Sequence, residues 1–225
     1  LVGWLETGHR FALVRMGDGE FQCLTKHQGE NCDGVRYSVE MAAALRHVIE
    51  NKSLLLCLSS IALDNGAREW IQENYPHEMW YEADVLVEAS KTGTLWPLVE
   101  TIRKRDMIYI GPGHLRGFAI DALDAIGFVE APLQTAFEHV TEIEGAAHEA
   151  IGANLADMVC ISAGPAGKVL VDRLATQWRG LTIWDMGSEW DMYAGHPSRS
   201  GHKRLTARQI DMLALDNFHW RRLHS

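Results

Sequence analysis

Two carboxylates two residues apart are the first candidates for chemistry in this sequence. They lie in residues 15–20, which read R-M-G-D-G-E, directly after an apolar run at 11–14 that predicts a β-strand. If the backbone stays extended, Asp18 and Glu20 point to the same side, because side chains alternate along a strand. Two oxygen ligands on one face suit Mg²⁺ or Mn²⁺ and leave coordination sites for substrate phosphates. Asp-Gly is also a turn signal, so a solvated turn stays as the alternative.

Two glycine-containing turns follow predicted strands further along the chain. Residues 111–117 read G-P-G-H-L-R-G, and residues 163–168 read A-G-P-A-G-K. A strand, a glycine turn and a helix N-terminus form the arrangement that binds an anion. The second turn is not a P-loop, since serine occupies the place of the first glycine of that motif and valine follows Lys168. Its N–H groups and lysine could hold a phosphate, or the turn could be purely structural.

The end of the chain differs in charge from the rest. Residues 196–225 carry six arginines and lysines against two aspartates, whereas the whole chain has a formal net charge of −9. This basic segment fits either a solvated face or an arm that touches a phosphate-bearing acceptor. We expect a catalytic domain over residues 1–195, with 196–225 as a basic loop and helix packed on the same domain.

Strands and helices alternate along the predicted domain. The predicted strands lie at 11–14, 54–58, 107–110, 128–132, 158–162 and 181–186, and the predicted helices at 39–50, 67–75, 95–105, 118–126, 141–155 and 169–178. This alternation predicts an α/β, Rossmann-like fold: a mostly parallel sheet with helices on both faces. The loops at the carboxyl ends of the strands should form the ligand crevice. Aromatic residues at 70–81 fit core packing or, alternatively, a stacking surface for a base or sugar.

Composition narrows the class of protein. The chain has 225 residues, 47% hydrophobic and 23% charged, which suits one large α/β domain or two small ones. No apolar run approaches the length of a membrane span, so we expect no membrane association. The histidines form no H-E-x-x-H motif, which argues against zinc. The four cysteines form no C-x-x-C pair, and Cys57 and Cys160 lie in apolar runs that predict buried sites. A disulfide between Cys23 and Cys32 stays open. Since nothing else indicates a disulfide scaffold, we expect a reducing cytoplasm.

In this order, the motifs resemble the GT-D type glycosyltransferases, the family long known as domain of unknown function 1792 (DUF1792). The resemblance spans about residues 10–195 and rests on R-x-G-D-G-E at 15–20, G-x-G at 111–113, I-S-A-G-P-A-G-K-V-L at 161–170 and D-M-G-S-E-W-D at 185–191. It implies a metal-dependent transferase that uses a nucleoside diphosphate-sugar, usually a UDP-sugar. Similar enzymes in phage-like settings modify hydroxymethylated pyrimidines such as 5-hydroxymethylcytosine in DNA, which would place this chain in the host cytoplasm.

The resemblance also implies roles for individual residues. Asp18 and Glu20 are the expected ligands of Mn²⁺ or Mg²⁺. The expected donor-binding residues are Arg15, Gly17, Gly111, Gly113, His114, Gly164, Pro165 and Lys168. Members of the family often read D-I-G-H-I-D after the last strand, whereas serine stands here at the histidine position, so no catalytic base carries over. The catalytic candidates are therefore Glu189, Asp191 and Asp185.

The motifs do not determine the acceptor. The aromatic residues and the basic segment, in particular Arg199, Lys203 and Arg204 as acceptor-binding candidates, make double-stranded DNA bearing hydroxymethylated bases a serious candidate. The net charge of −9 argues against DNA, although local charge matters more than the sum. A glycan is the other possible acceptor. A module that binds a nucleotide or nucleotide-sugar without catalysis is the alternative function. A dehydrogenase is disfavoured because no dinucleotide fingerprint follows the first predicted strand.

Overall fold

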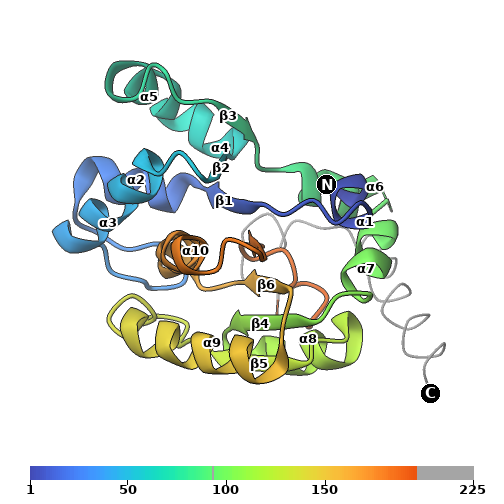
Figure 1. Ribbon diagram of the computed structural model, residues 1–225. Helices are drawn as coiled ribbons and strands as arrows, with labels where there is room; N and C mark the ends of the chain where they lie inside the picture. Colours follow the sequence, from blue (N-terminus) through green and yellow to red (C-terminus); the bar gives the residue numbers. More distant parts are fainter. Residues whose placement is uncertain (93, 197–225) are drawn as a thin grey trace.

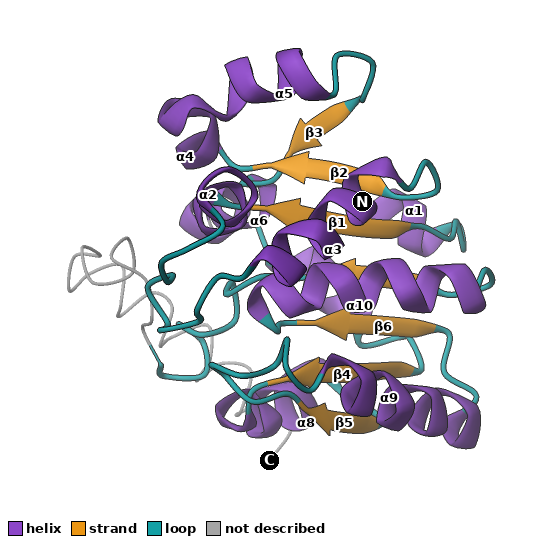
Figure 2. Cartoon of the chain, turned by 90° about the vertical axis from the view of Figure 1, so that its left-hand side faces the viewer, coloured by secondary structure: helices purple, strands orange, loops and turns teal. Residues whose placement is uncertain are grey.

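The computed structural model describes residues 1–92 and 94–196, and within them it contains one parallel sheet. Its seven strands have the order β3-β2-β1-β7-β6-β4-β5, and every neighbouring pair is parallel (Figures 1 and 2). Their bounds are β1 (Ala12–Met16), β2 (Leu55–Leu58), β3 (Trp80–Glu82), β4 (Met107–Gly111), β5 (Gly127–Glu130), β6 (Met158–Ile161) and β7 (Thr182–Asp185). The predicted Rossmann-like α/β fold is confirmed.

Helices cover both faces of this sheet. Their bounds are α1 (Val2–Glu6), α2 (Asp18–Lys26), α3 (Val39–Glu50), α4 (Ser60–Ala62), the π-type turn η1 (Leu63–Ala67), α5 (Arg68–Asn74), α6 (Val85–Thr92), α7 (Trp96–Ile102), the 3₁₀ turn η2 (Gly113–Leu115), α8 (Arg116–Leu123), α9 (Val140–Asn154) and α10 (Gly164–Gln177). Helices α2, α3, α9 and α10 share one buried cluster with the sheet, and α1, α6, α7 and α8 share the other.

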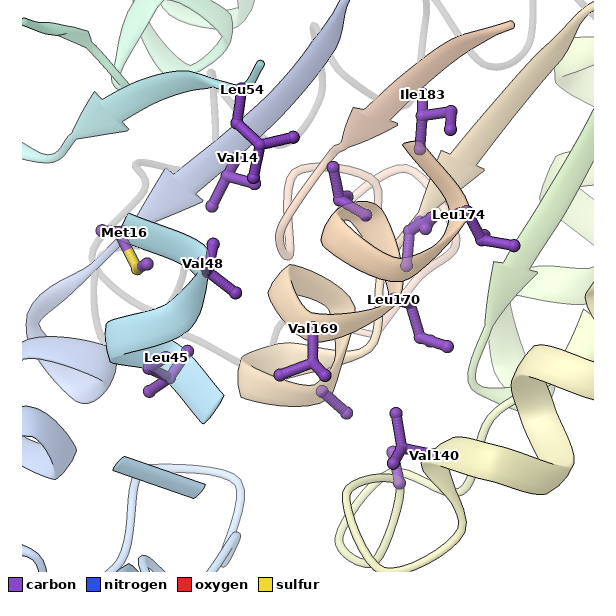
Figure 3. Packing of buried hydrophobic residues seen from close by; sticks show 14 of the residues in the cluster. Val14, Met16, Leu45, Val48, Leu54, Val140, Val169, Leu170, Leu174 and Ile183 are labelled. Carbon is purple, nitrogen blue, oxygen red and sulfur yellow. The ribbon is translucent and has the colours of Figure 1, made fainter. Parts of the chain in front are cut away.

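The strands supply both clusters by alternation. In β1, Val14 and Met16 face the cluster that contains α3 and α10, whereas Leu13 faces the opposite one. Figure 3 shows the first cluster, in which Val48 of α3 lies beside Val14 of β1, and Leu45 of α3 and Leu170 of α10 belong to the same cluster. Nearly continuous apolar sequence in strands such as β4 and β6 follows from this burial on both faces.

The backbone of residues 18–20 is not extended, although an extended backbone is the condition for Asp18 and Glu20 to point to the same side. Helix α2 begins at Asp18, and Gly17 is its N-cap. Asp18 and Glu20 therefore occupy the first and third positions of a helix, where their side chains do not share a face as they would in a strand. Phe21, Cys23 and Leu24 bury the inner side of this helix, which explains why the segment folds as a helix against the core.

Other differences from the sequence prediction are local. The turn at 163–168 is largely the start of α10, so Lys168 lies inside the helix. The short edge strand β3 lies within the aromatic segment that the sequence left unassigned. Trp70, Tyr75 and Trp80 pack against the core, which supports the packing interpretation of these aromatics. Among the described residues, no helix is long and apolar enough to cross a membrane.

The connections between the strands define the position of the expected ligand crevice. Strand β6 is followed by α10 on one face, whereas its neighbour β4 is followed by α8 on the other. Connections that leave neighbouring strands toward opposite faces separate at their carboxyl ends, and ligands of open α/β sheets bind there. The residues that follow β6, β4, β7 and β1 therefore surround the expected crevice.

Candidate functional site

A buried ion-pair cluster connects two helices and a strand end at the carboxyl edge of the sheet. The Nζ atom of Lys168 lies 3.2 Å from Oε1 of Glu20 and 3.0 Å from Oδ2 of Asp185. Lys168 comes from α10, Glu20 from α2 and Asp185 from the end of β7. The three residues are 3%, 8% and 0% exposed, so this ammonium is shielded from solvent by its partners and surroundings. Lys168 thus contacts two protein carboxylates, where the sequence predicted a contact with a diphosphate.

The protonation of this cluster follows from opposing effects. Burial by itself would raise the pKa of Glu20, but the Lys168 ammonium and the N–H of Gly17 outweigh it and lower that pKa. Burial would likewise lower the pKa of Lys168, but the Asp185 and Glu20 carboxylates raise it instead. Both residues are therefore charged at neutral pH, and each one keeps the other ionised.

Backbone N–H groups complete the hydrogen bonding of both carboxylates. Oε2 of Glu20 accepts a hydrogen bond from Gly17 N at 2.9 Å, which is the link that closes the start of α2. Oδ2 of Asp185 accepts from Arg15 N at 3.0 Å, and its Oδ1 accepts from Gly187 N at 3.0 Å. Asp185 thus ties β1 to the segment that follows β7, an arrangement suited to holding the site in shape.

Arg15 is the second cation of the predicted donor site, and backbone carbonyls hold its guanidinium. Its Nε donates to Ala83 O at 3.1 Å, and its Nη1 donates to Met186 O at 2.6 Å. Gly187 has a φ of +61°, and a Cβ there would lie 2.9 Å from Nη1 of Arg15. Glycine is required at this position both by its backbone conformation and by the close approach of the arginine.

Asp18, in contrast to Glu20, is exposed at the start of α2. Gly19 between them is covered by Tyr37, since a Cβ on Gly19 would lie 3.3 Å from the tyrosine hydroxyl. This hydroxyl is buried and finds no hydrogen-bond partner in the described part of the chain. Burial, followed by the Glu20 and Asp18 carboxylates, raises the pKa of Tyr37 well above its usual range. No sequence motif contains Tyr37, so no signal in the sequence pointed to it.

A histidine and an aspartate form a second polar cluster nearer to β4. His114 lies in η2 directly after β4, and its Nε2 is 3.1 Å from Oδ1 of Asp191. The ring of His196 stacks on His114 with centroids 4.2 Å apart. Asp191 is 6% exposed, whereas the His114 side chain is 23% exposed. The predicted donor residue His114 and the catalytic candidate Asp191 are thus direct partners.

The predicted glycines of this region have structural reasons for being glycine. A Cβ on Gly111 would lie 2.9 Å from the Tyr109 ring, and the Tyr109 hydroxyl is 2.7 Å from that of Ser162 on the neighbouring strand end. A Cβ on Gly113 would lie 3.1 Å from the carboxylate of Glu130. These contacts bring the ends of β4, β5 and β6 close together, which is compatible with a donor site but does not require one.

The start of α10 carries the other predicted donor residues. Gly164 has a φ of +54°, and Pro165 lies in the first turn of the helix, where its missing N–H is no loss. Glu189 follows β7 and is 7% exposed. The acceptor-binding candidates Arg199, Lys203 and Arg204 lie outside the described residues.

The cysteines differ in one respect from the sequence expectation. None of the four cysteines forms a disulfide, so the suggested pairing of Cys23 with Cys32 is not present. Cys23 is buried in the core beside α2, whereas Cys32 is exposed. Cys57 and Cys160 are buried, as their apolar surroundings in the sequence predicted.

The donor atoms at the edge of the sheet decide whether a metal ion fits. Among the described residues, no group of three or more His, Cys, Asp or Glu side chains could hold a metal by itself. Mg²⁺ and Mn²⁺ can, however, be held by one or two carboxylates together with substrate phosphates. Asp18 offers an exposed carboxylate, and Glu20 keeps acceptor capacity because a carboxylate has about four lone-pair positions. The residues therefore fit a metal bound first of all by Asp18.

Comparison with known proteins supports the fold. No protein-family model matches the chain, and no curated protein matches it. Two solved structures do: the selenomethionine-substituted structure of domain of unknown function 1792, with a TM-score of 0.65 and 18% identity, and a structure described as "the highly conserved domain of unknown function 1792 has a distinct glycosyltransferase fold", with a TM-score of 0.64 and 20% identity. Each alignment covers 94% of this chain and 91% of the other. The chain thus has the DUF1792 fold, described as a glycosyltransferase fold, as the motifs predicted.

Proposed function

We propose that this protein is a metal-dependent glycosyltransferase that moves a sugar from a nucleoside diphosphate-sugar, in the first instance a UDP-sugar, to an acceptor hydroxyl. The observation that carries this proposal is the exposed Asp18 carboxylate at the start of α2, beside the cluster of Glu20, Lys168 and Asp185. It supports the proposal because it stands at the carboxyl edge of the sheet, where ligands of this fold class bind.

Different residues would contribute to binding the diphosphate of the donor. Asp18, assisted by Glu20, would hold Mn²⁺ or Mg²⁺, and that ion when bound neutralises charge that builds on the leaving diphosphate. The N–H groups at the start of α2 and α10 point toward the same edge and favour an anion there. Lys168 keeps Glu20 ionised and fixed, because its ammonium is bound to that carboxylate. It acts on the donor through this positioning.

The proposal includes two possible acceptors. Either a hydroxymethylated pyrimidine in double-stranded DNA or a glycan could present the hydroxyl. Arg199, Lys203 and Arg204 are the residues of this sequence that we propose for DNA phosphates. Purified protein, tested with duplex DNA with and without 5-hydroxymethylcytosine, would separate the two forms by a hexose-sized gain in the mass of the DNA.

A donor assay tests the transferase itself. Purified protein with Mn²⁺ and a panel of UDP- and GDP-sugars should release the nucleoside diphosphate, and EDTA should stop the release. Asp18→Asn should lower the rate by about 10²-fold or more, because the neutral amide is a much poorer ligand for a divalent cation. Asp121→Asn is the matched control, since Asp121 is an exposed aspartate on α8, a helix on the other face of the sheet.

The alternative function predicts a different result in the same experiment. A module that binds a nucleotide without catalysis would bind UDP but release none from any donor, with either metal. Nucleotide binding without turnover in the wild-type protein would therefore favour the binding module.

A further inference from the structure

We propose that His114, oriented by Asp191, is the general base that takes the proton from the acceptor hydroxyl. This inference rests on the proposed function and adds the residue that activates the acceptor. It answers the question that the sequence left open, since serine stands at position 188 where a histidine often stands in the similar family.

The geometry of the pair is that of an oriented base. Nε2 of His114 lies 3.1 Å from Oδ1 of Asp191, so the ring donates its Nε2 proton to the carboxylate. That hydrogen bond fixes the tautomer and leaves the lone pair on Nδ1 to accept a proton. No residue in the described ranges forms a hydrogen bond with Nδ1. Asp191 is 6% exposed and the His114 side chain 23%, so the carboxylate is buried behind a ring that a substrate can reach.

The place of His114 in the fold supports the same role. His114 lies in the first turn after β4. Strand β4 neighbours β6, and the two strands lead to helices on opposite faces of the sheet, β4 to α8 and β6 to α10. Asp191 reaches it from the segment after β7, which begins at the ion-pair cluster. The base and the proposed metal-binding residue Asp18 thus lie on the same edge of the sheet. Three strand spacings, about 14 Å, separate β4 from β1, a span comparable to an extended nucleoside diphosphate-sugar.

The other acidic candidates at this edge are less suited to accept a proton. Glu20 and Asp185 are both bound to the Lys168 ammonium, and Asp185 is fully buried. Glu189 is 7% exposed, which shields it from an acceptor. Glu130 is exposed but paired with an arginine at 3.0 Å. The His114 ring combines partial exposure, an oriented tautomer and a position at the crevice.

The chemical step balances without another reactant. The acceptor oxygen forms a bond to the anomeric carbon of the sugar while its proton passes to Nδ1 of His114. The bond between that carbon and the diphosphate oxygen breaks, and the nucleoside diphosphate leaves with the electron pair. A base that activates the attacking oxygen is the requirement of a single displacement, so we expect inversion at the anomeric carbon.

The test uses donor hydrolysis, in which water is the acceptor. Wild-type protein and variants receive Mn²⁺ with UDP-glucose, UDP-galactose, UDP-N-acetylglucosamine or GDP-mannose, and release of UDP or GDP is followed. His114→Gln should lower kcat by about 10²- to 10⁴-fold with little change in KM for the donor. His47→Gln is the matched control, because His47 also pairs with an aspartate, Asp172, at 2.9 Å, but lies near the end of α3 away from the carboxyl edge. It should leave the rate unchanged.

Two further readouts separate a chemical role from a structural one. The role as base replaces the donor contact that the sequence predicted for His114, so UDP binding and thermal unfolding should be alike in wild type and His114→Gln. In ¹⁵N NMR spectra, His114 should carry its proton on Nε2, and Asp191→Asn should disturb that preference and lower kcat. The sugar released first from an α-linked donor should be the β-anomer.

The outcomes distinguish the two proposals. Loss of turnover in His114→Gln with intact UDP binding, together with inversion, supports the base. Turnover above about a tenth of the wild-type rate in His114→Gln, or retention of configuration, would overturn the base and leave the transferase standing. No release from any donor by the wild-type protein would refute the transferase and the base together.

Discussion

Replacing Lys168 with methionine tests whether the buried ion-pair cluster organises the carboxyl edge of the sheet. Methionine approximates the length of the lysine stem but removes the ammonium, and the side chain is only 4% exposed. The substitution leaves the Glu20 and Asp185 carboxylates buried without the cation that lies 3.2 and 3.0 Å away in the wild type.

The size of the effect follows from what those carboxylates lose and keep. Removing one partner of a buried ion pair costs about 3–5 kcal/mol, because a charge stays buried without compensation. The variant leaves two buried carboxylates without their cation. Glu20 still accepts a hydrogen bond from the Gly17 N–H, and Asp185 still accepts two from backbone N–H groups, which reduces the cost. We therefore expect Lys168→Met to lower the free energy of unfolding by about 3–5 kcal/mol. In a protein of this size, 3 kcal/mol corresponds to a fall in Tm of about 6–12 °C.

Urea denaturation measured as a function of pH is the assay. In the wild type the pKa of Glu20 is lowered below 4.5, so its stabilising contribution is present above that pH and is lost as the pH falls through the lowered value. Without the ammonium, burial raises the pKa of Glu20 relative to the wild type, and the folded variant takes up a proton more readily. The difference in stability between variant and wild type should therefore narrow from pH 7 to about pH 5.

Two matched variants make this test specific. Arg173 lies on the same helix and pairs with Glu144 at 3.0 Å, but its side chain is 38% exposed, so Arg173→Met should cost less than about 1 kcal/mol. Adding Glu20→Gln to Lys168→Met removes one of the uncompensated charges and should restore part of the stability. A loss below about 1 kcal/mol in Lys168→Met, without the pH dependence, would refute the reasoning on the cluster.

Two other predictions follow from single residues. Gly187→Ala should destabilise the protein by about 1–2 kcal/mol in thermal unfolding, because φ is +61° and the new Cβ would lie 2.9 Å from the Arg15 guanidinium. Gly180→Ala, with no atom within 4 Å of the new Cβ, is the control, and equal effects would contradict the strain argument. Iodoacetamide at neutral pH should alkylate the exposed Cys32 first, whereas burial raises the pKa of Cys57 to about 12; early labelling of Cys57 by mass spectrometry would contradict this assignment.

The regular part of the fold could be predicted from the sequence because burial leaves a clear pattern. Strands such as β4 and β6 are apolar on both faces, and α3 repeats its buried residues at helical spacing, so these elements are visible in the chain. The helical conformation of residues 18–20 could not be predicted from the sequence. The hydrogen bond from Gly17 N to the Glu20 carboxylate, together with Phe21 in the core, turns this D-x-E segment into the start of a helix.

The candidate site was predictable in its residues but not in its pairings. The sequence placed Lys168 and Glu20 in one crevice, yet it could not show that they bind each other, because their contact depends on the packing of α10 against β1. The partnership of His114 with Asp191 is equally remote, since they are 77 positions apart along the chain. Tyr37 belongs to no motif, and only the fold brings its hydroxyl to Gly19.

The most direct test of the central claim is nucleoside diphosphate release by the purified protein with Mn²⁺ and the donor panel, run beside Asp18→Asn and Asp121→Asn. We expect release with at least one UDP-sugar, its loss with EDTA and in Asp18→Asn, and its persistence in Asp121→Asn. Release that continues at the wild-type rate in Asp18→Asn would contradict the assignment of Asp18 to the metal. The absence of release from every donor would contradict the transferase itself.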